Sequence, residues 1–208
     1  MGHSITTMPI KAEILKLCTV AEMKENLRIS YTKEDELIER SILAAYDWLA
    51  GEQGWLNRSI LPTTWTMTLP AVATVELPMA APAISLTSFT YLVGGVATPV
   101  PPASYVLSKA GTLSYARLSL ANGATWPTDA DVHPEGVEIV YVAGMAADAD
   151  AVRAKYFGLH KAMALLAGDY FRNREDTFTD IRMVEIDRKV VNGVNRVGGR
   201  YRFMNNQV

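Results

Sequence analysis

The stretch "ADADAVRAKYFGLHKAMALLAGDYFRNRED", residues 147–176, decides the fold that we predict for this chain. Its large apolar residues recur in steps of four and three, which is the spacing of one face of an α-helix. These residues are Val152, Tyr156, Leu159, Met163, Leu166 and Tyr170. The small residues Gly158, Ala162 and Gly168 would let another helix approach closely. Because one helix cannot bury so wide an apolar face alone, the stretch predicts packing against other helices.

Two earlier segments can supply these partner helices. The segment "TVAEMKENLRI" (19–29) begins with Thr19 and has Glu22 three residues later, which is the pattern of a helix capping box. The segment "YTKEDELIERSILAAYDWLAGEQGW" (31–55) can be capped by Thr32 and carries acidic residues in its first turn, where the helix dipole favours them. We therefore expect a helical bundle built from segments that are far apart in the sequence.

The region between these helices has the composition of β-strands. From about residue 59 to 146, charged residues are sparse, prolines recur, and Val, Thr, Ile and Tyr dominate. The segment "AISLTSFTYLVGGVATPV" (83–100) predicts a hairpin that turns at Gly94 and Gly95. The other predicted strand segments are "TTWTMTL" (63–69), "SYVLSKAGTLSYARLSL" (104–120), which indicates a second hairpin, and "GVEIVYVAG" (136–144).

The predicted fold class is α+β: a helical bundle with an inserted antiparallel β domain and an extended C-terminal arm. We assign residues 1–58 to an N-terminal segment with the first two helices, and residues 59–147 to the β insertion. Residues 148–176 form the third long helix, and residues 177–208 form the extended arm. An insertion is the economical arrangement, because the third helix needs the first two to cover its apolar face.

The predicted arm is basic, with no acidic residue after Asp187. In an extended strand, the alternation in "RYRF" (200–203) would place two cations on one side and two aromatic rings on the other. This suits addition to the sheet edge or groove of a partner protein. The residues expected to bind the partner are Arg188, Lys189, Val191, Arg196, Arg200, Tyr201, Arg202 and Phe203. The alternative is a solvated or frayed terminus.

Charge and composition exclude several function classes. The formal net charge is -2, which argues against a protein that coats nucleic acid with its whole surface. The single cysteine, Cys18, cannot form an intrachain disulfide or build a zinc site alone. The longest apolar stretch is far below the roughly 20 residues of a membrane span, and the N-terminus lacks the apolar core of a signal peptide. We therefore expect neither export by a signal peptide nor insertion in a membrane.

Few residues in the sequence could carry out chemistry. A catalytic site needs a nucleophile, a base and an orienting group, or a set of metal ligands. His3 and His133 lie outside the predicted helices, and His160 lies on the third helix but off its main apolar stripe. The acids of "TDADVHPEG" (128–136) do not have the spacing of a calcium-binding EF-hand loop. We therefore predict that the protein is not an enzyme and has no catalytic residue, no metal site and no cofactor.

Several segments, in this order, resemble one known family. They are "TVAEMKENLRI", "DELIERSILAAYDWLAG", "ILPTTWTMTL", "ELPMAAPAISLTSFTYL", the pair Trp126-Pro127, "VEIVYVAGMA" and "HKAMALLAGDYFRNRED". The chain resembles, over about residues 19–176, the head-to-tail connector family of tailed phages, prophages and gene transfer agents, also called adaptor or head-completion proteins. Two features depart from the family pattern. The link "GWLNRSILPTTW" (54–65) is longer than usual, and the ending "RVGGRYRFMNNQV" (196–208) replaces a short proline-containing one.

The resemblance implies a structural virion protein of the neck, at the head-tail junction, made in the host cytoplasm. It implies a homo-oligomeric ring, expected to be twelve-fold, that lies under the portal protein and extends the DNA channel. The ring would offer a docking platform to a stopper or tail protein, without a membrane and without sequence-specific DNA binding. A near-neutral chain suits such a channel, because a basic lining would hold the DNA phosphates.

We predict that the end of the third helix lies at a subunit boundary of this ring. Tyr170 and Phe171 would contribute packing, and the charged residues would select the orientation of the neighbour. Those charged residues are Arg172, Arg174, Glu175 and Asp176. The alternative for this site is a solvated helix end, whose ion pairs contribute about 0 to 1 kcal/mol. The alternatives for the whole protein are another virion or tail-assembly binding module without portal contact, and an enzyme.

Overall fold

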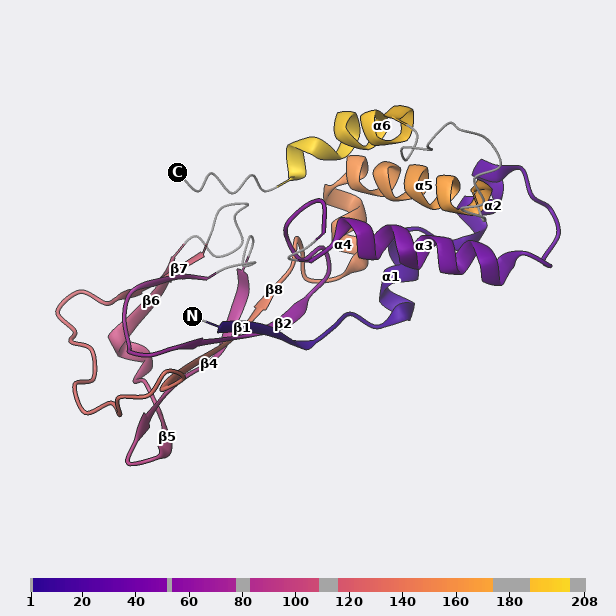
Figure 1. The fold of residues 1–208 in the computed structure, drawn as a ribbon. Coiled ribbons are helices and arrows are strands. Elements are labelled where there is room, and N and C mark those ends of the chain that lie inside the picture. The colour runs from indigo at the N-terminus through magenta and orange to yellow at the C-terminus, as the bar shows by residue number, and fades with distance from the viewer. Residues whose placement is uncertain (1, 52–53, 78–82, 109–115, 174–187, 203–208) are drawn as a thin grey trace. The chain divides into compact units, whose positions relative to one another are not determined.

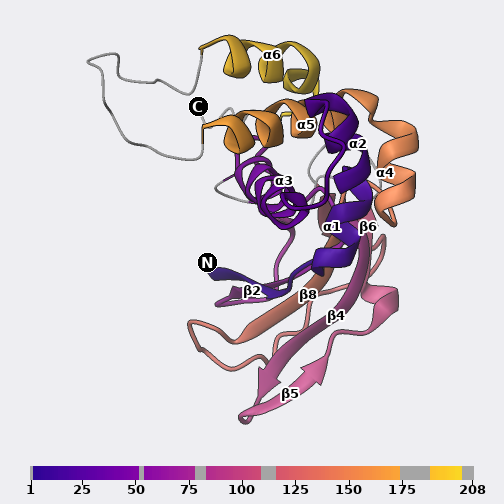
Figure 2. The same ribbon diagram turned by 90° about the vertical axis from the view of Figure 1, so that its right-hand side faces the viewer.

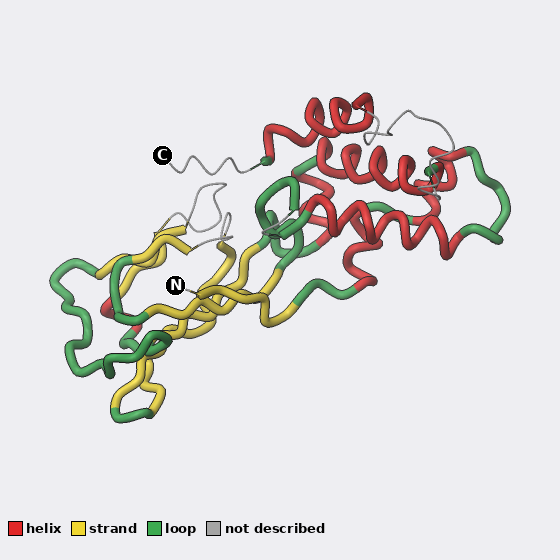
Figure 3. The backbone as a smooth tube through the Cα atoms, in the orientation of Figure 1, coloured by secondary structure: helices red, strands yellow, loops and turns green. Residues whose placement is uncertain are grey.

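The computed structural model describes all residues except 1, 52–53, 78–82, 109–115, 174–187 and 203–208. The chain forms two compact units. The β unit consists of Met1–Pro9 and Ser59–Ala147, and the helical unit consists of Ile10–Arg58 and Asp148–Val208. Figure 3 shows strands in the first unit and helices in the second. The predicted α+β class is confirmed, since the structure contains both helices and antiparallel sheets.

The helical unit is a bundle in which α5 packs against both α3 and α6 (Figure 1). Helix α2 also packs against α5, and α1 against α4 (Figure 2). The bounds are α1, Lys11–Leu17; α2, Val20–Leu27; α3, Asp35–Leu49; α4, Ala149–Lys155; α5, Phe157–Arg172; and α6, Arg188–Gly198. The buried core includes Met23, Ile38, Ile42, Leu49, Leu159, Met163 and Leu166. The predicted packing of the third helix against the first two is therefore confirmed.

The helix predicted over residues 148–176 is two helices. Its start is as expected, because the Asp148 side chain accepts a hydrogen bond from the Ala151 N–H and caps α4. Tyr156 ends α4 and precedes α5 with φ -124° and ψ 60°, which lie outside the helical region. The Tyr156 ring is buried and lies edge-on to the ring of Tyr201, with centroids 5.4 Å apart. The apolar stripe stays buried across this break, except that Tyr170 is half-buried.

The close helix approach predicted from small residues occurs at the start of α5. A Cβ atom added to Gly158 would lie 2.2 Å from the carbonyl oxygen of Val197, so only glycine allows α6 to lie at this distance. Ala162 contributes in the same way, since its Cβ would be 3.4 Å from a Cβ on Gly198. Gly168 is different, because a Cβ there would meet only the ends of two side chains of α2, at 3.8 and 4.0 Å.

The extended C-terminal arm was predicted wrongly for residues 188–201, which form α6 and then a 3-10 turn over Gly199–Tyr201. Apolar residues recur at Val190, Val194, Val197 and Tyr201, a helical spacing of four and three, and Val194 and Tyr201 are buried. This apolar face packs on α5 and makes the segment helical. Asn192 and Gly193, a pair that is common in hairpin turns, both lie within α6. The remaining arm residues, 177–187 and 203–208, lie outside the described part of the chain.

The β unit contains one sheet with the strand order β1-β2-β8-β4-β5 and a second with the order β3-β7-β6. All described strand pairs are antiparallel. The bounds are β1, Gly2–Thr7; β2, Thr63–Leu69; β3, Val75–Leu77; β4, Ala83–Val93; β5, Val96–Pro99; β6, Tyr105–Ser108; β7, Ala116–Leu120; and β8, Val137–Ala143. We assigned the N-terminal segment to the helices, but its strand β1 pairs with β2 at the sheet edge.

The predicted strand patterns are found in the structure. The residues of β2 alternate strictly between buried and half-buried, as "TTWTMTL" indicates. The β4–β5 hairpin turns at Gly94 and Gly95, whose φ angles of 58° and 78° lie in the left-handed region that favours glycine. Strands β6 and β7 also pair. The core of this unit includes Trp65, Met67, Leu77, Phe89, Leu118, Ile139 and Tyr141.

Candidate functional site

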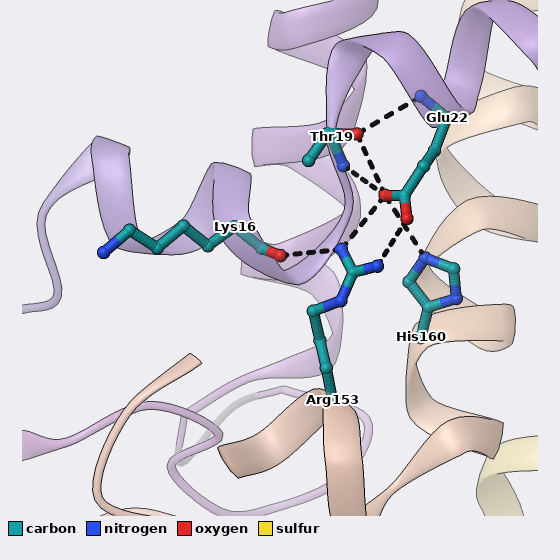
Figure 4. A network of polar contacts seen from close by, with 5 residues as sticks. All are labelled: Lys16, Thr19, Glu22, Arg153 and His160. Atoms are coloured by element: carbon teal, nitrogen blue, oxygen red, sulfur yellow. Dashed lines mark hydrogen bonds and ion pairs between the residues drawn. The ribbon is translucent and has the colours of Figure 1, made fainter. Parts of the chain in front are cut away.

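A network of polar contacts around Glu22 joins four helices of the helical unit, α1, α2, α4 and α5 (Figure 4). Glu22 completes the predicted capping box of α2: its carboxylate accepts from the Thr19 N–H at 2.9 Å, and its own N–H donates to the Thr19 hydroxyl at 3.2 Å. Arg153 of α4 donates through both terminal nitrogens to the same carboxylate, with Nη1 3.1 Å from Oε2. Arg153 also donates to the carbonyl oxygen of Lys16 in the last turn of α1, at 2.9 Å. The end of α1 and the start of α2 are thereby fixed to α4.

The electrostatics of this network follow from its geometry. The Arg153 guanidinium, helped by the donors of Thr19, holds the pKa of Glu22 at about 2, against a partial cost of burial. Burial, together with the nearby Glu22 charge, raises the pKa of the Cys18 thiol to about 12. The His160 Nε2 atom lies 3.6 Å from Glu22 Oε2 and makes no hydrogen bond to any described residue. At neutral pH the site therefore holds a carboxylate paired with a guanidinium, beside a protonated thiol.

Cys18, Glu22 and His160 are also the one group of metal-ligand side chains that the described residues bring together, with ligand atoms within 4.8 Å of one another. Sulfur, oxygen and nitrogen donors of this kind suit zinc. The carboxylate, however, is already engaged by Arg153 and Thr19, and a metal would have to displace the guanidinium and deprotonate the thiol. The arrangement fits a structural ion pair better than a metal centre.

The end of α5, where we predicted a subunit boundary, is partly described. Phe171 is 7% exposed and belongs to the core of its own helical unit. Tyr170 is half-buried, and burial raises the pKa of its hydroxyl. Arg172 is exposed. Arg174, Glu175 and Asp176 lie outside the described residues, so the boundary at this site stays a prediction.

A groove between α2 and α5 was missed by the sequence reasoning. It has a volume of about 190 Å³, its apolar lining includes Met23, Leu27 and Leu165, and Val190 of α6 also borders it. Lys161 and Arg172 also line it, together with Asp169. The spacing of Lys161, Leu165, Gly168 and Arg172 by four, three and four residues could have indicated this second face of α5.

The described residues of the predicted arm contact their own helical unit. The guanidinium of Arg200 lies over the Tyr201 ring, 4.7 Å from its centroid, and that of Arg202 lies 5.3 Å from the centroid of Trp55. Arg196 is exposed and Val191 is half-buried in α6. Arg188 and Lys189 form the start of α6. Phe203 lies outside the described residues.

No protein-family model and no curated protein matches the sequence. Solved structures do. A chain from the neck of an empty GTA (gene transfer agent) particle, computed with C6 symmetry, aligns over 98% of this chain and 96% of its own length, with 25% identity and a TM-score of 0.69. This is the fold of a gene transfer agent neck chain. The resemblance to head-to-tail connectors stated from the sequence is confirmed.

Two further structures of this kind share the neck-chain fold. A chain from the neck of a native GTA particle, computed with C12 symmetry, is 23% identical with a TM-score of 0.68 over 98% of this chain and 96% of that one. A chain from the virion of a native GTA particle is 24% identical with a TM-score of 0.66 over 94% of both chains. The similarity therefore extends across both units and beyond residues 19–176, where the sequence motifs lie. Among the described residues, no helix is both long and apolar enough to cross a membrane.

Proposed function

We propose that this chain is a structural protein of the neck of a phage-like particle, where it forms a ring under the portal protein. The observation that carries the proposal is the similarity, over nearly the whole chain, to chains from GTA necks. Those necks were computed with C6 and C12 symmetry, which supports a ring, and we propose twelve copies. The ring would extend the DNA channel of the portal and offer a platform to a stopper or tail protein.

The charge of the chain supports a channel through which DNA slides. A ring of basic subunits would bind phosphates with an affinity that grows with every contact, and would slow the passage of DNA. A chain with a net charge of -2 has no overall attraction for the DNA phosphates. The polar network around Glu22 joins helices of one subunit, so its chemistry is compatible with a structural role rather than catalysis.

The basic residues of α6 and of the turn that follows it are proposed to attach the ring to the portal. Arg196 and Arg200 are exposed, the first on α6 and the second on the 3-10 turn that follows it, so neither is presented from an extended strand. Many copies would bind the portal together, so a weak contact in each copy is sufficient. We expect the double variant Arg196→Glu with Arg200→Glu to lose portal attachment, whereas Arg40→Glu, on the exposed face of α3, keeps it.

The mass in solution tests the proposed ring. Light scattering would be measured on the full-length protein alone and after mixing with portal rings of the same particle. We expect the portal mass to increase by a fixed number of subunits, and electron microscopy to show added density on one face of the portal. A portal that elutes without bound protein would contradict the proposal and would favour a tail-assembly module without portal contact.

A further inference from the structure

Val132 is presented to solvent by a loop that the β unit holds in place. It lies between β7 and β8, and its side chain is as exposed as in an isolated residue, at 105%. The Asp131 carboxylate beside it accepts hydrogen bonds from the N–H groups of Gly94 and Gly95, at 3.0 and 2.8 Å. The Asp131 N–H also donates to the Leu92 carbonyl at 2.8 Å. The valine is therefore fixed in an exposed position by contacts of its neighbour.

The surroundings of Val132 are acidic and contain a second exposed valine. Asp129 and Glu135 are exposed on the same loop. Val96, 66% exposed, follows the Gly94–Gly95 turn to which Asp131 is bonded. Single exposed apolar residues are common on protein surfaces, but an apolar tip whose loop is anchored by hydrogen bonds and carries exposed acidic residues has the features of a recognition element.

The α2–α5 groove has the complementary features. Its lining includes the apolar side chains of Met23, Leu27 and Leu165, and Lys161 and Arg172 contribute two positive charges against the single carboxylate of Asp169. Its volume of about 190 Å³ is below the roughly 300 to 1,000 Å³ of small-molecule sites, so it fits one or two side chains. Gly168 contributes no side chain to this lining, and the nearest atoms to a Cβ placed there are the ends of the Met23 and Leu27 side chains, at 3.8 and 4.0 Å.

We infer that the Val132 loop of one copy of this chain binds in the α2–α5 groove of the next copy. The inference rests on the proposed ring. A closed ring requires a heterologous contact, in which one surface of a subunit meets a different surface of its neighbour. An acidic loop with an apolar tip, and a groove whose lining combines apolar side chains with a surplus of positive charge, are two such surfaces. In this contact Val132 fills the space beside Gly168, and Glu135 lies near Arg172.

A charge exchange tests this contact. In the mass assay with portal rings, Glu135→Arg and Arg172→Glu are each expected to weaken ring formation by about tenfold or more, because like charges then meet in the contact. The two substitutions in one chain should restore ring formation. Glu76→Arg on β3 and Arg40→Glu on α3 are matched controls that reverse exposed charges elsewhere and should leave the ring intact. Circular dichroism verifies that each variant is folded.

A disulfide test identifies the residues directly. A Cβ at Gly168 meets no atom closer than 3.8 Å, so Gly168→Cys is tolerated, and the buried Cys18 will not compete for oxidation. Chains carrying both Val132→Cys and Gly168→Cys should form covalent ladders on the portal under oxidising conditions, and neither single variant should.

The outcomes separate the inference from the proposed function. The inference would be wrong if rings assemble on the portal, form no 132–168 disulfide and are unaffected by either charge reversal. The proposed function would still hold in that case. A disulfide that closes within one chain would also overturn it. If the unmodified protein forms no ring on the portal, the proposed function fails and the inference fails with it.

Discussion

Replacing Arg153 by methionine should destabilise the helical unit by more than the loss of an ordinary surface ion pair. The Arg153 guanidinium is the largest cause of the low pKa of Glu22, which is about 2 instead of 4.5. This difference corresponds to about 3 kcal/mol, at about 1.4 kcal/mol for each pH unit. The side chains of Arg153 and Glu22 are 32% and 31% exposed, and Thr19 supplies part of the effect. Solvent screening therefore reduces the expected loss to about 1–2 kcal/mol.

The matched control is Arg40→Met on the exposed face of α3. Arg40 also pairs with a glutamate, Glu36, but the two side chains are 67% and 81% exposed and the atoms are 3.5 Å apart. Its loss should cost about 0.5 kcal/mol or less. Urea unfolding of the full chain at neutral pH would give both free energies. Hydrogen exchange would show whether Arg153→Met opens α1 and α2, which the network fixes to α4.

The pH dependence supplies a second, independent criterion. Because the pKa of Glu22 is lower in the folded state, its contribution is fully present above 4.5 and is lost as the pH falls towards about 2. The difference between the unmodified chain and Arg153→Met should fall by about half between neutral pH and about pH 3. A loss no larger than that of Arg40→Met, or a difference that stays constant with pH, would refute the reasoning.

Three further changes have expected outcomes. Gly158→Ala should detach α6 from α5, since the new Cβ would lie 2.2 Å from the Val197 carbonyl oxygen. Faster proteolysis near residue 190 would show this detachment. The control Gly168→Ala, whose Cβ meets no atom closer than 3.8 Å, should stay as resistant to proteolysis as the unmodified chain. Thr19→Ala should cost about 1 kcal/mol in urea unfolding, because the cap of α2 is lost; Thr19→Ser should cost much less, and equal losses would contradict the cap. In Asp131→Ala the Gly94 and Gly95 amides should exchange faster with solvent, whereas in the control Asp129→Ala their exchange should not change. The hydrogen bonds from these amides lower the pKa of Asp131. In the unmodified chain the amides should therefore lose their protection only when the pH falls below the usual carboxyl range of about pH 4. If amide exchange is unchanged in Asp131→Ala, the Asp131 carboxylate does not hold the loop at the Gly94–Gly95 turn.

The sequence predicted those elements that depend on interactions between residues close together in the chain. The capping box of Thr19 and Glu22 forms within one helical turn. The alternation of buried and half-buried residues along β2 indicates that one face of the sheet is buried. The α6 helix was missed although its apolar residues have a helical spacing, because the Asn192-Gly193 pair has low helix propensity. Packing on α5 stabilises the helix in spite of this pair. Propensity is outweighed by tertiary contacts in this segment.

The network and the groove could not be predicted, for a different physical reason. Glu22 and Arg153 are 131 residues apart, and neither residue has a local pattern that indicates the other. The α2–α5 groove depends on how residues of α2, α5 and α6 come together, which the spacing on α5 alone does not determine. The exposed position of Val132 follows from the bonds of Asp131 to a turn 36 and 37 residues earlier.

The division of the helical unit between Ile10–Arg58 and Asp148–Val208 has a consequence for biosynthesis. On the ribosome, α3 leaves the exit tunnel with Ile38, Ile42 and Leu49 ready for burial, but its partner α5 follows about a hundred residues later. At about 5–20 residues per second, the apolar face of α3 waits for about 5 to 20 seconds. The β unit, whose last strand ends at Ala143, is complete before α5 emerges. Nascent chains of this protein should therefore fold the β unit first, while the early helices bind a chaperone or remain exposed to aggregation.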